Sequence, residues 1–181
     1  METTALETLK YPVGKYVKPG KISPDELKKY ISVLHDFPGK VKLETNGLEK
    51  NALTFKHRPE GWTIRQLVHH CADSHMNAFI RTKLALTEDN PTVTPYIENE
   101  WAKLTDTADA PIEWSVQILD GMHNRWAKLL SSLSPAQMER TFFHPEHKRN
   151  IPISELVPMY AWHCEHHLAH IKQAKKFQNK F

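Results

Sequence analysis

The stretch Trp162-His-Cys-Glu-His-His-Leu-Ala-His170 places four histidines within eight residues of a segment with helical periodicity. On a helix, His163 and His167 are about one turn apart and project from the same face, with Cβ atoms about 5–6 Å apart. Two imidazoles at that spacing can bind one metal ion, with zinc–nitrogen bonds of about 2.0–2.1 Å. His170 continues the same stripe, and His166 lies at its flank. The stretch therefore predicts part of a metal site on a helix.

A catalytic metal site needs at least one more ligand from another part of the chain. The second histidine-rich stretch is Gly61-Trp-Thr-Ile-Arg-Gln-Leu-Val-His-His-Cys-Ala-Asp-Ser-His75, which contains a capping box that predicts the start of a helix. At about 100° per residue, one narrow sector of this helix carries the polar residues Thr63, Gln66, His70, Ser74, Asn77 and Arg81. The rest of its circumference is largely apolar. The polar stripe is either the solvated face or the lining of a pocket, and we favour the pocket.

His70 lies at the centre of this stripe, so we predict that it is the third metal ligand beside His163 and His167. The remaining groups expected around the metal or a substrate are Gln66, Ser74, Asn77, Arg81 and His170. Arg81 is about 16 Å along the helix axis from His70 and could hold the far end of an anionic substrate. His69 is rotated by about 100° and is expected to form hydrogen bonds outside the site, whereas His75 is expected to face the opposite side, at the surface.

Other roles for these residues are less well supported by the sequence. Histidines clustered on a helix are often only half-buried, hydrogen-bonded side chains, and the third centred histidine favours a metal. The HExxH motif of zinc proteases is absent, and Glu165 points about 200° away from His163, so it is not expected to be a general base. Cys71 and Cys164 are interpreted as small buried residues.

The rest of the chain predicts a four-helix bundle of the all-α class, in which facing helices build metal sites. The long helices are expected at residues 24–48, 63–86, 111–133 and 154–177, the first of them kinked or interrupted at Pro38-Gly39. Residues 1–21 are expected to form an extended arm. Shorter features are expected at residues 98–104 (helical), after Ser134 (a helical turn) and at 143–151 (a hairpin). The connection at 87–110 is long enough to cross the bundle.

Length and composition set the broad class. The 181 residues are expected to form a single domain, residues 1–181, and the net charge of +3 gives no reason to expect nucleic-acid binding. No apolar run approaches the roughly 20 residues that span a bilayer. The N-terminus lacks a signal-peptide pattern and two cysteines do not suggest a disulfide framework, so a cytoplasmic location is expected.

Several of these stretches together resemble the DinB-like superfamily, and most closely its YfiT branch. The matching stretches are Tyr11-Pro-Val-Gly14, residues 61–77, Tyr96 with Trp101, Phe143-His-Pro-Glu146 and residues 162–171. The resemblance implies a bundle with up-down-down-up helix order, a homodimer, and one divalent zinc or nickel ion per chain held by His70, His163 and His167. The chain departs from the branch at Ile97, where an acidic residue is common, and at Cys164 and Glu165.

The resemblance also implies the activity to expect. Members are described as metal-dependent hydrolases, and some resemble transferases that join a low-molecular-weight thiol, bacillithiol in this branch, to electrophiles. Three protein ligands leave a position for water or a thiolate, so one site could support either reaction on a small-molecule substrate. The alternative is a metal-binding, stress-linked protein without turnover, which a fourth ligand such as His166 or His170 would favour.

Overall fold

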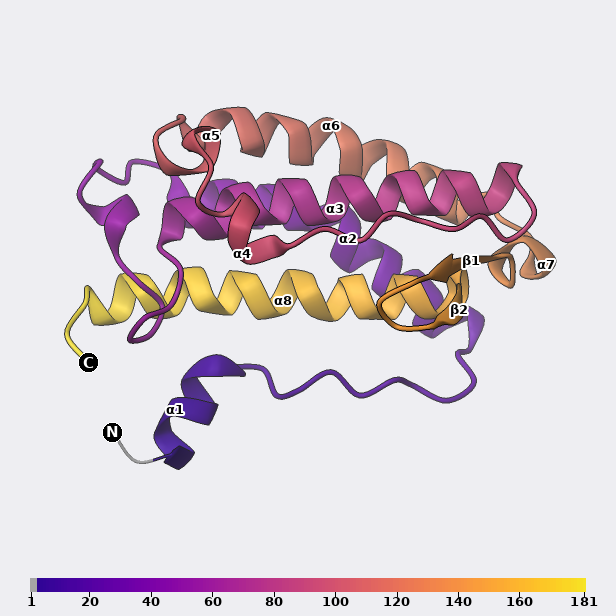
Figure 1. The fold of residues 1–181 in the computed structure, drawn as a ribbon, viewed down its shortest axis with the longest axis horizontal. Coiled ribbons are helices and arrows are strands. Elements are labelled where there is room, and N and C mark those ends of the chain that lie inside the picture. The colour runs from indigo at the N-terminus through magenta and orange to yellow at the C-terminus, as the bar shows by residue number, and fades with distance from the viewer. Residues whose placement is uncertain (1–2) are drawn as a thin grey trace.

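Four long helices form the body of the computed structural model, which describes residues 3–181, with side chains from residue 6 onward. They are α2 (Pro24–Thr45), α3 (Ile64–Thr87), α6 (Ile112–Ser131) and α8 (Ile153–Phe177). α2 and α8 run in one direction, and α3 and α6 run in the other (Figure 1). Each of α2 and α3 packs mainly against α6 and α8. The predicted all-α bundle with up-down-down-up order is confirmed.

The long connection between α3 and α6 follows from this order. Because these two helices are parallel, the chain must travel back along the length of the bundle before α6 can begin (Figure 1). On the way, the Val93 amide donates to the Phe143 carbonyl at 3.0 Å, which fixes the connection against the hairpin. The connection then forms α4 (Glu98–Trp101) and α5 (Thr105–Ala108). The single turn α5 lies beyond the helical stretch expected at residues 98–104, and Arg65 supports it by donating to the Asp109 and Ala110 carbonyls that follow.

The helix starts were read correctly from their capping residues. Ser23 and Thr63 each form a capping box, and Pro24 occupies the first turn of α2. Of the kink or interruption expected at Pro38, the interruption is absent: α2 is one helix in which Pro38 is buried, and it ends at Thr45 rather than Leu48. Pro38 still removes one helical hydrogen bond, the one that a residue with an N–H would donate to the Leu34 carbonyl.

The N-terminal segment also differs from the expected extended arm. Thr3–Lys10 forms helix α1, stabilised by an ion pair between Lys10 and Glu7 at 3.1 Å; Met1 and Glu2 lie outside the described residues. This helix is too short to give a clear periodic signal. From there an extended stretch runs beside α8 (Figure 1). It is held there by hydrogen bonds from Trp162 to the Gly14 carbonyl at 3.1 Å and from Gln173 to the Leu9 carbonyl at 3.0 Å.

The expected hairpin is present as β1 (Thr141–His144) and β2 (Arg149–Pro152), an antiparallel pair that follows the short helix α7 (Pro135–Met138). A 3₁₀ turn, η1 (Ala52–Thr54), lies in the loop before α3. The buried Glu155 carboxylate anchors the hairpin through Arg149 and the N-terminal arm through Lys18, at 2.7 Å to Lys18 Nζ. Within residues 3–181, no helix has the length and apolarity that a membrane span requires.

Two tryptophans on α6 provide a test of where the core lies. Trp126 is fully buried and donates through Nε1 to the Thr82 hydroxyl at 3.1 Å, whereas Trp114 is 61% exposed. We expect Trp126→Ala to lower the free energy of unfolding by about 3–5 kcal/mol, because it leaves a cavity between α6 and α3. Trp114→Ala is expected to change it by no more than about 0.5 kcal/mol. Urea denaturation monitored by circular dichroism measures both, and equal losses would contradict this packing.

Candidate metal centre

Two facing helices bring the three predicted ligands together in the bundle core. α3 carries His70, and α8 carries His163 and His167. The capping box between Thr63 and Gln66 fixes where α3 begins, and hence which face of the helix His70 occupies. The three ligand atoms fall in one group that could hold a metal ion.

The spacing of the three Nε2 atoms fits a single divalent ion. His163 Nε2 lies 3.4 Å from His70 Nε2 and 3.1 Å from His167 Nε2. Metal–nitrogen bonds of about 2.0–2.1 Å in a tetrahedral arrangement place two ligand nitrogens about 3.3–3.4 Å apart. Burial lowers the pKa of His70 to about 4 and lowers the pKa values of His163 and His167 well below the ordinary value. The imidazoles are therefore neutral at physiological pH, the state that ligates zinc or nickel.

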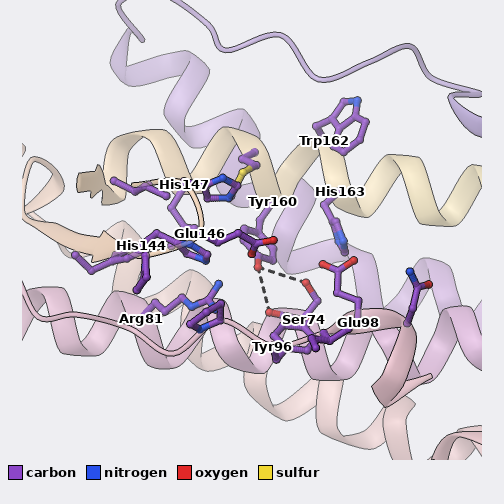
Figure 2. Close-up of a pocket in the computed structure, with 18 residues that line it drawn as sticks. Ser74, Arg81, Tyr96, Glu98, His144, Glu146, His147, Tyr160, Trp162 and His163 are labelled. Carbon is purple, nitrogen blue, oxygen red and sulfur yellow. Dashed lines mark hydrogen bonds between the residues drawn. The ribbon is translucent and has the colours of Figure 1, made fainter. Parts of the chain in front are cut away.

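A pocket of about 810 Å³ opens beside His163. Ser74 and Arg81 of the polar stripe line it, together with Tyr160, whose hydroxyl donates to the Ser74 carbonyl at 3.2 Å (Figure 2). The buried Arg81 side chain donates to the Thr94 carbonyl at 3.0 Å, so the long connection between α3 and α6 (the return connection) holds it in place. The structure thus places two of the predicted stripe residues, Ser74 and Arg81, in the same pocket as one metal ligand.

Gln66 and Asn77, also predicted for the site, have structural hydrogen bonds instead. The Gln66 amide oxygen caps α3, and its nitrogen donates to the Ala102 carbonyl at 3.0 Å. Asn77 donates to the Asp73 carbonyl of its own helix at 2.9 Å. Gln66 therefore ties the return connection to α3, and Asn77 bonds within α3.

Glu98 was missed by the sequence reasoning. It lines the large pocket together with His163, and it also lines a second pocket of about 290 Å³ together with His167 and His170. Figure 2 shows its carboxylate directed towards His163. Partial desolvation in the pocket, and then repulsion from Glu146, raises the pKa of the Glu98 carboxyl although its side chain keeps contact with solvent, while Arg81 opposes the shift. The available sequence signal was weak: an acidic residue in the first turn of a four-residue helix inside a long connection.

The prediction that His75 is a surface residue was wrong. His75 is fully buried, and its Nε2 lies 2.9 Å from His163 Nδ1 while its Nδ1 lies 2.7 Å from His123 Nε2. The helical wheel correctly turned His75 away from His70, but the opposite face of α3 meets other helices rather than water. His69 lies outside the site, as expected, with Nδ1 2.7 Å from the Ser115 hydroxyl and Nε2 3.2 Å from the Ala110 carbonyl.

The remaining histidines of α8 lie behind the site. His170 Nδ1 is 3.4 Å from His167 Nδ1, and His170 Nε2 donates to the Lys10 carbonyl at 3.1 Å. His166 stacks on Trp162 with ring centroids 4.4 Å apart, and its Nδ1 is buried without a hydrogen-bond partner. His166, His167 and His170 form a second group able to hold a metal, but it shares His167 with the first. The two groups are therefore parts of one histidine cluster.

The other candidates from the sequence have no catalytic geometry. Glu165 forms an ion pair with Lys40 at 3.1 Å, which joins α8 to α2. Cys71 and Cys164 are fully buried, and burial raises the pKa of both thiols. Both cysteines are thus small core residues, and neither is a thiolate at neutral pH.

The fold and this histidine site identify the class of protein. The family model described as "DinB superfamily" matches residues 42–171, and the chain belongs to that family. The chain is 47% identical over 162 residues to "Putative metal-dependent hydrolase OB0782" of Oceanobacillus iheyensis, covering 90% of this chain and 93% of that protein. It is 40% identical over 168 residues to "Putative metal-dependent hydrolase YfiT" of Bacillus subtilis, covering 93% and 94%.

The solved structure of YfiT from Bacillus subtilis has the same fold. It superposes with a TM-score of 0.91 over 94% of this chain and 98% of that chain, at 40% identity. It is described as "a probable metal-dependent hydrolase with an unusual four-helix bundle topology". The resemblance to the YfiT branch that the motifs indicated is therefore confirmed.

Removal of single ligands tests the centre. We expect the protein to bind about one divalent metal per chain, and His70→Ala, His163→Ala and His167→Ala each to lose most of its metal affinity, because two imidazoles hold an ion far more weakly than three. His69→Ala is the matched control, since it removes a neighbouring buried histidine with hydrogen bonds outside the site. Elemental analysis and zinc titration measure the outcome; equal metal content in all four variants would refute the assignment.

The buried histidines also predict how stability depends on pH without metal. Burial lowers the pKa of His57 and His123 to about 4, so below about pH 6.5 the unfolded chain takes up protons that the folded chain does not. Their contribution to stability is complete above pH 6.5 and is lost as the pH falls towards 4. We expect urea denaturation in chelator to show a falling free energy of unfolding from pH 7.5 to 5, with a smaller fall in His123→Gln. A flat profile would contradict it.

Proposed function

We propose that this protein is a metal-dependent enzyme of the hydrolase type that acts on a small molecule in the 810 Å³ pocket. The observation that carries the proposal is the convergence of three neutral imidazole nitrogens, at 3.1 and 3.4 Å, beside that pocket. The names of the relatives support the same class of activity. His70, His163 and His167 would hold a divalent ion, which would supply the Lewis acidity that makes water or a thiol nucleophilic near neutral pH.

The protein's own groups supply the proton transfer and the binding. Glu98 faces His163 from the opposite wall, so its carboxylate is placed to accept the proton that a nucleophile loses beside the site. Its raised pKa makes it a better base than an ordinary carboxylate. Arg81, a buried residue that lines the same pocket, presents a fixed cation that suits a carboxylate or phosphate on the substrate. The hydroxyls of Ser74 and Tyr160 offer hydrogen bonds between these two ends.

One observation favours a second candidate, the transfer of a low-molecular-weight thiol to an electrophile. The histidine site lies between two pockets: His163 lines the larger and His167 the smaller, and Glu98 lines both. Two substrates could therefore reach the site from different sides, an arrangement that suits a reaction joining two molecules. We also propose that the metal is zinc or nickel, that the protein forms a homodimer and that it acts in the cytoplasm.

The non-catalytic alternative would be favoured by a fourth protein ligand that closed the site. Among residues 3–181, the group at the first site contains three histidines, and His170 turns its Nδ1 towards His167 Nδ1 rather than towards the Nε2 atoms. The arrangement therefore favours an open coordination position, which is typical of catalytic sites.

Glu98→Gln tests the proposal. We expect it to keep the metal and to reduce kcat by about 10²–10⁴-fold, because an amide cannot accept the proton. Glu100→Gln is the matched control: Glu100 lies on the same helix, is exposed and pairs with Lys103 at 2.6 Å. Zinc- and nickel-loaded protein is assayed on ester and amide substrates and, separately, on thiols with electrophiles. Equal activity of both variants would contradict the role of Glu98, and no turnover in either assay would support the non-catalytic alternative.

A further inference from the structure

A line of hydrogen-bonded groups crosses the bundle behind His163, with one residue from each long helix. His163 Nδ1 of α8 lies 2.9 Å from His75 Nε2 of α3, and His75 Nδ1 lies 2.7 Å from His123 Nε2 of α6. His123 Nδ1 then lies 2.5 Å from the Leu34 carbonyl of α2. His75 and His123 are both fully buried, so neither can exchange these partners for water.

The last acceptor in this line is free because of the sequence of α2. In a regular helix, the Leu34 carbonyl would accept the amide N–H of residue 38. Residue 38 is proline, which has no N–H, so the helix leaves this buried carbonyl without its usual donor. An unpaired buried carbonyl is costly. His123 supplies the missing donor, and the same bond fixes which of its nitrogens carries the proton.

The direction of the line follows from counting protons. A carbonyl can only accept, so His123 Nδ1 must carry its proton, and a neutral His123 then presents an unprotonated Nε2. His75 must donate from Nδ1 to that nitrogen, which leaves His75 Nε2 free to accept from His163 Nδ1. Three hydrogen bonds use the three protons of three neutral imidazoles. The lone pair of His163 Nε2 is therefore left facing His70 and His167.

A second, shorter line of hydrogen bonds orients His167 through His170. His170 Nε2 donates at 3.1 Å to the carbonyl of Lys10, the last residue of α1, whose carbonyl has no donor within that helix. A neutral His170 then presents an unprotonated Nδ1 to His167 Nδ1, 3.4 Å away. His167 must donate from Nδ1 across that longer contact, and its Nε2 lone pair also faces the site.

We propose that these two histidine chains, each ending on a backbone carbonyl that a helix leaves free, fix the tautomers of His163 and His167 for metal binding before any ion arrives. His75, His123 and His170 are positioning residues in this inference, which rests on the proposed metal site. His75, His123 and His170 are buried, and a buried imidazole without a carboxylate partner is stable in its neutral form, so the chains are neutral. The chains end on carbonyls that have no proton to give, so they orient the ligands and do not conduct protons.

The tautomers can be measured without metal and without activity. In the wild-type chain labelled with ¹⁵N-histidine and held in chelator, we expect His163, His75, His123 and His167 to carry the proton on Nδ1 and His170 to carry it on Nε2. Long-range ¹H–¹⁵N correlation spectra distinguish the two forms. A proton on His163 Nε2, or mixed tautomers along either chain, would overturn the inference even if the protein binds zinc. The assigned tautomers in a protein that binds no zinc would instead sink the proposed function alone.

Variants at His123 test the consequence for affinity. His123→Phe removes the acceptor of His75, so His75 is free to reverse and place the proton on His163 Nε2; we expect zinc affinity to fall about 10–100-fold. His123→Gln keeps both an acceptor oxygen and a donor amide, and we expect it to restore most of the affinity. His69→Phe is the matched control, a buried histidine bonded to Ser115 and the Ala110 carbonyl.

Competition with a zinc chelator and denaturation curves are measured on all three variants. Loss of stability in His123→Phe and His69→Phe with loss of affinity in His123→Phe alone is the expected result. Equal affinities in these two variants would contradict the inference. Should His123→Phe fail to fold, the wild-type tautomers still decide it.

Discussion

Burying imidazoles in a helical bundle requires that each N–H group finds an acceptor, and this constraint organises the structure. An unmatched polar group in a core costs free energy comparable to a lost hydrogen bond or more. Here the acceptors at the ends of the histidine chains are backbone carbonyls of Leu34 and Lys10. Pro38 makes the first available inside a helix, and the end of α1 makes the second available. Local breaks in helical hydrogen bonding thus supply what the polar core needs.

The same constraint explains why the site is tied to the whole fold. The chain behind His163 uses α8, α3, α6 and α2 in turn, so its geometry exists only when all four helices are packed. A bound ion would stabilise this packed state over the unfolded chain by mass action. Burial favours the neutral form of the core imidazoles, so their protonation at low pH lowers the stability of the fold. The same burial keeps the histidines of the candidate metal site in the neutral state that can bind a metal ion.

The long helices and the metal-ligand candidates could be predicted from the sequence because they depend on residues close together in the chain. Capping boxes and prolines placed the starts of the long helices, and the spacing of His163 and His167 placed two ligands on one face. What failed depended on tertiary packing. A helical wheel gives the direction in which the His75 side chain points, but it does not show whether water or another helix lies on that side. In the structure, His123 of α6 lies there. The prediction for residues 3–10 was wrong because eight residues are too few for a clear periodic signal, and the hydrogen bonds that α8 makes to the Lys10 and Leu9 carbonyls exist only in the folded chain.

Glu98 shows a different limit, one set by topology. Up-down-down-up order makes α3 and α6 parallel, and a parallel pair needs a connection that returns along the full length of the bundle (Figure 1). That return passes the open side of the histidine site and leaves Tyr96 and Glu98 lining its pocket. An up-and-down bundle with short loops would have no such segment to carry Glu98 past the histidines. The up-down-down-up helix order therefore places a candidate base in the pocket beside the candidate metal site, and only the assembled fold reveals it.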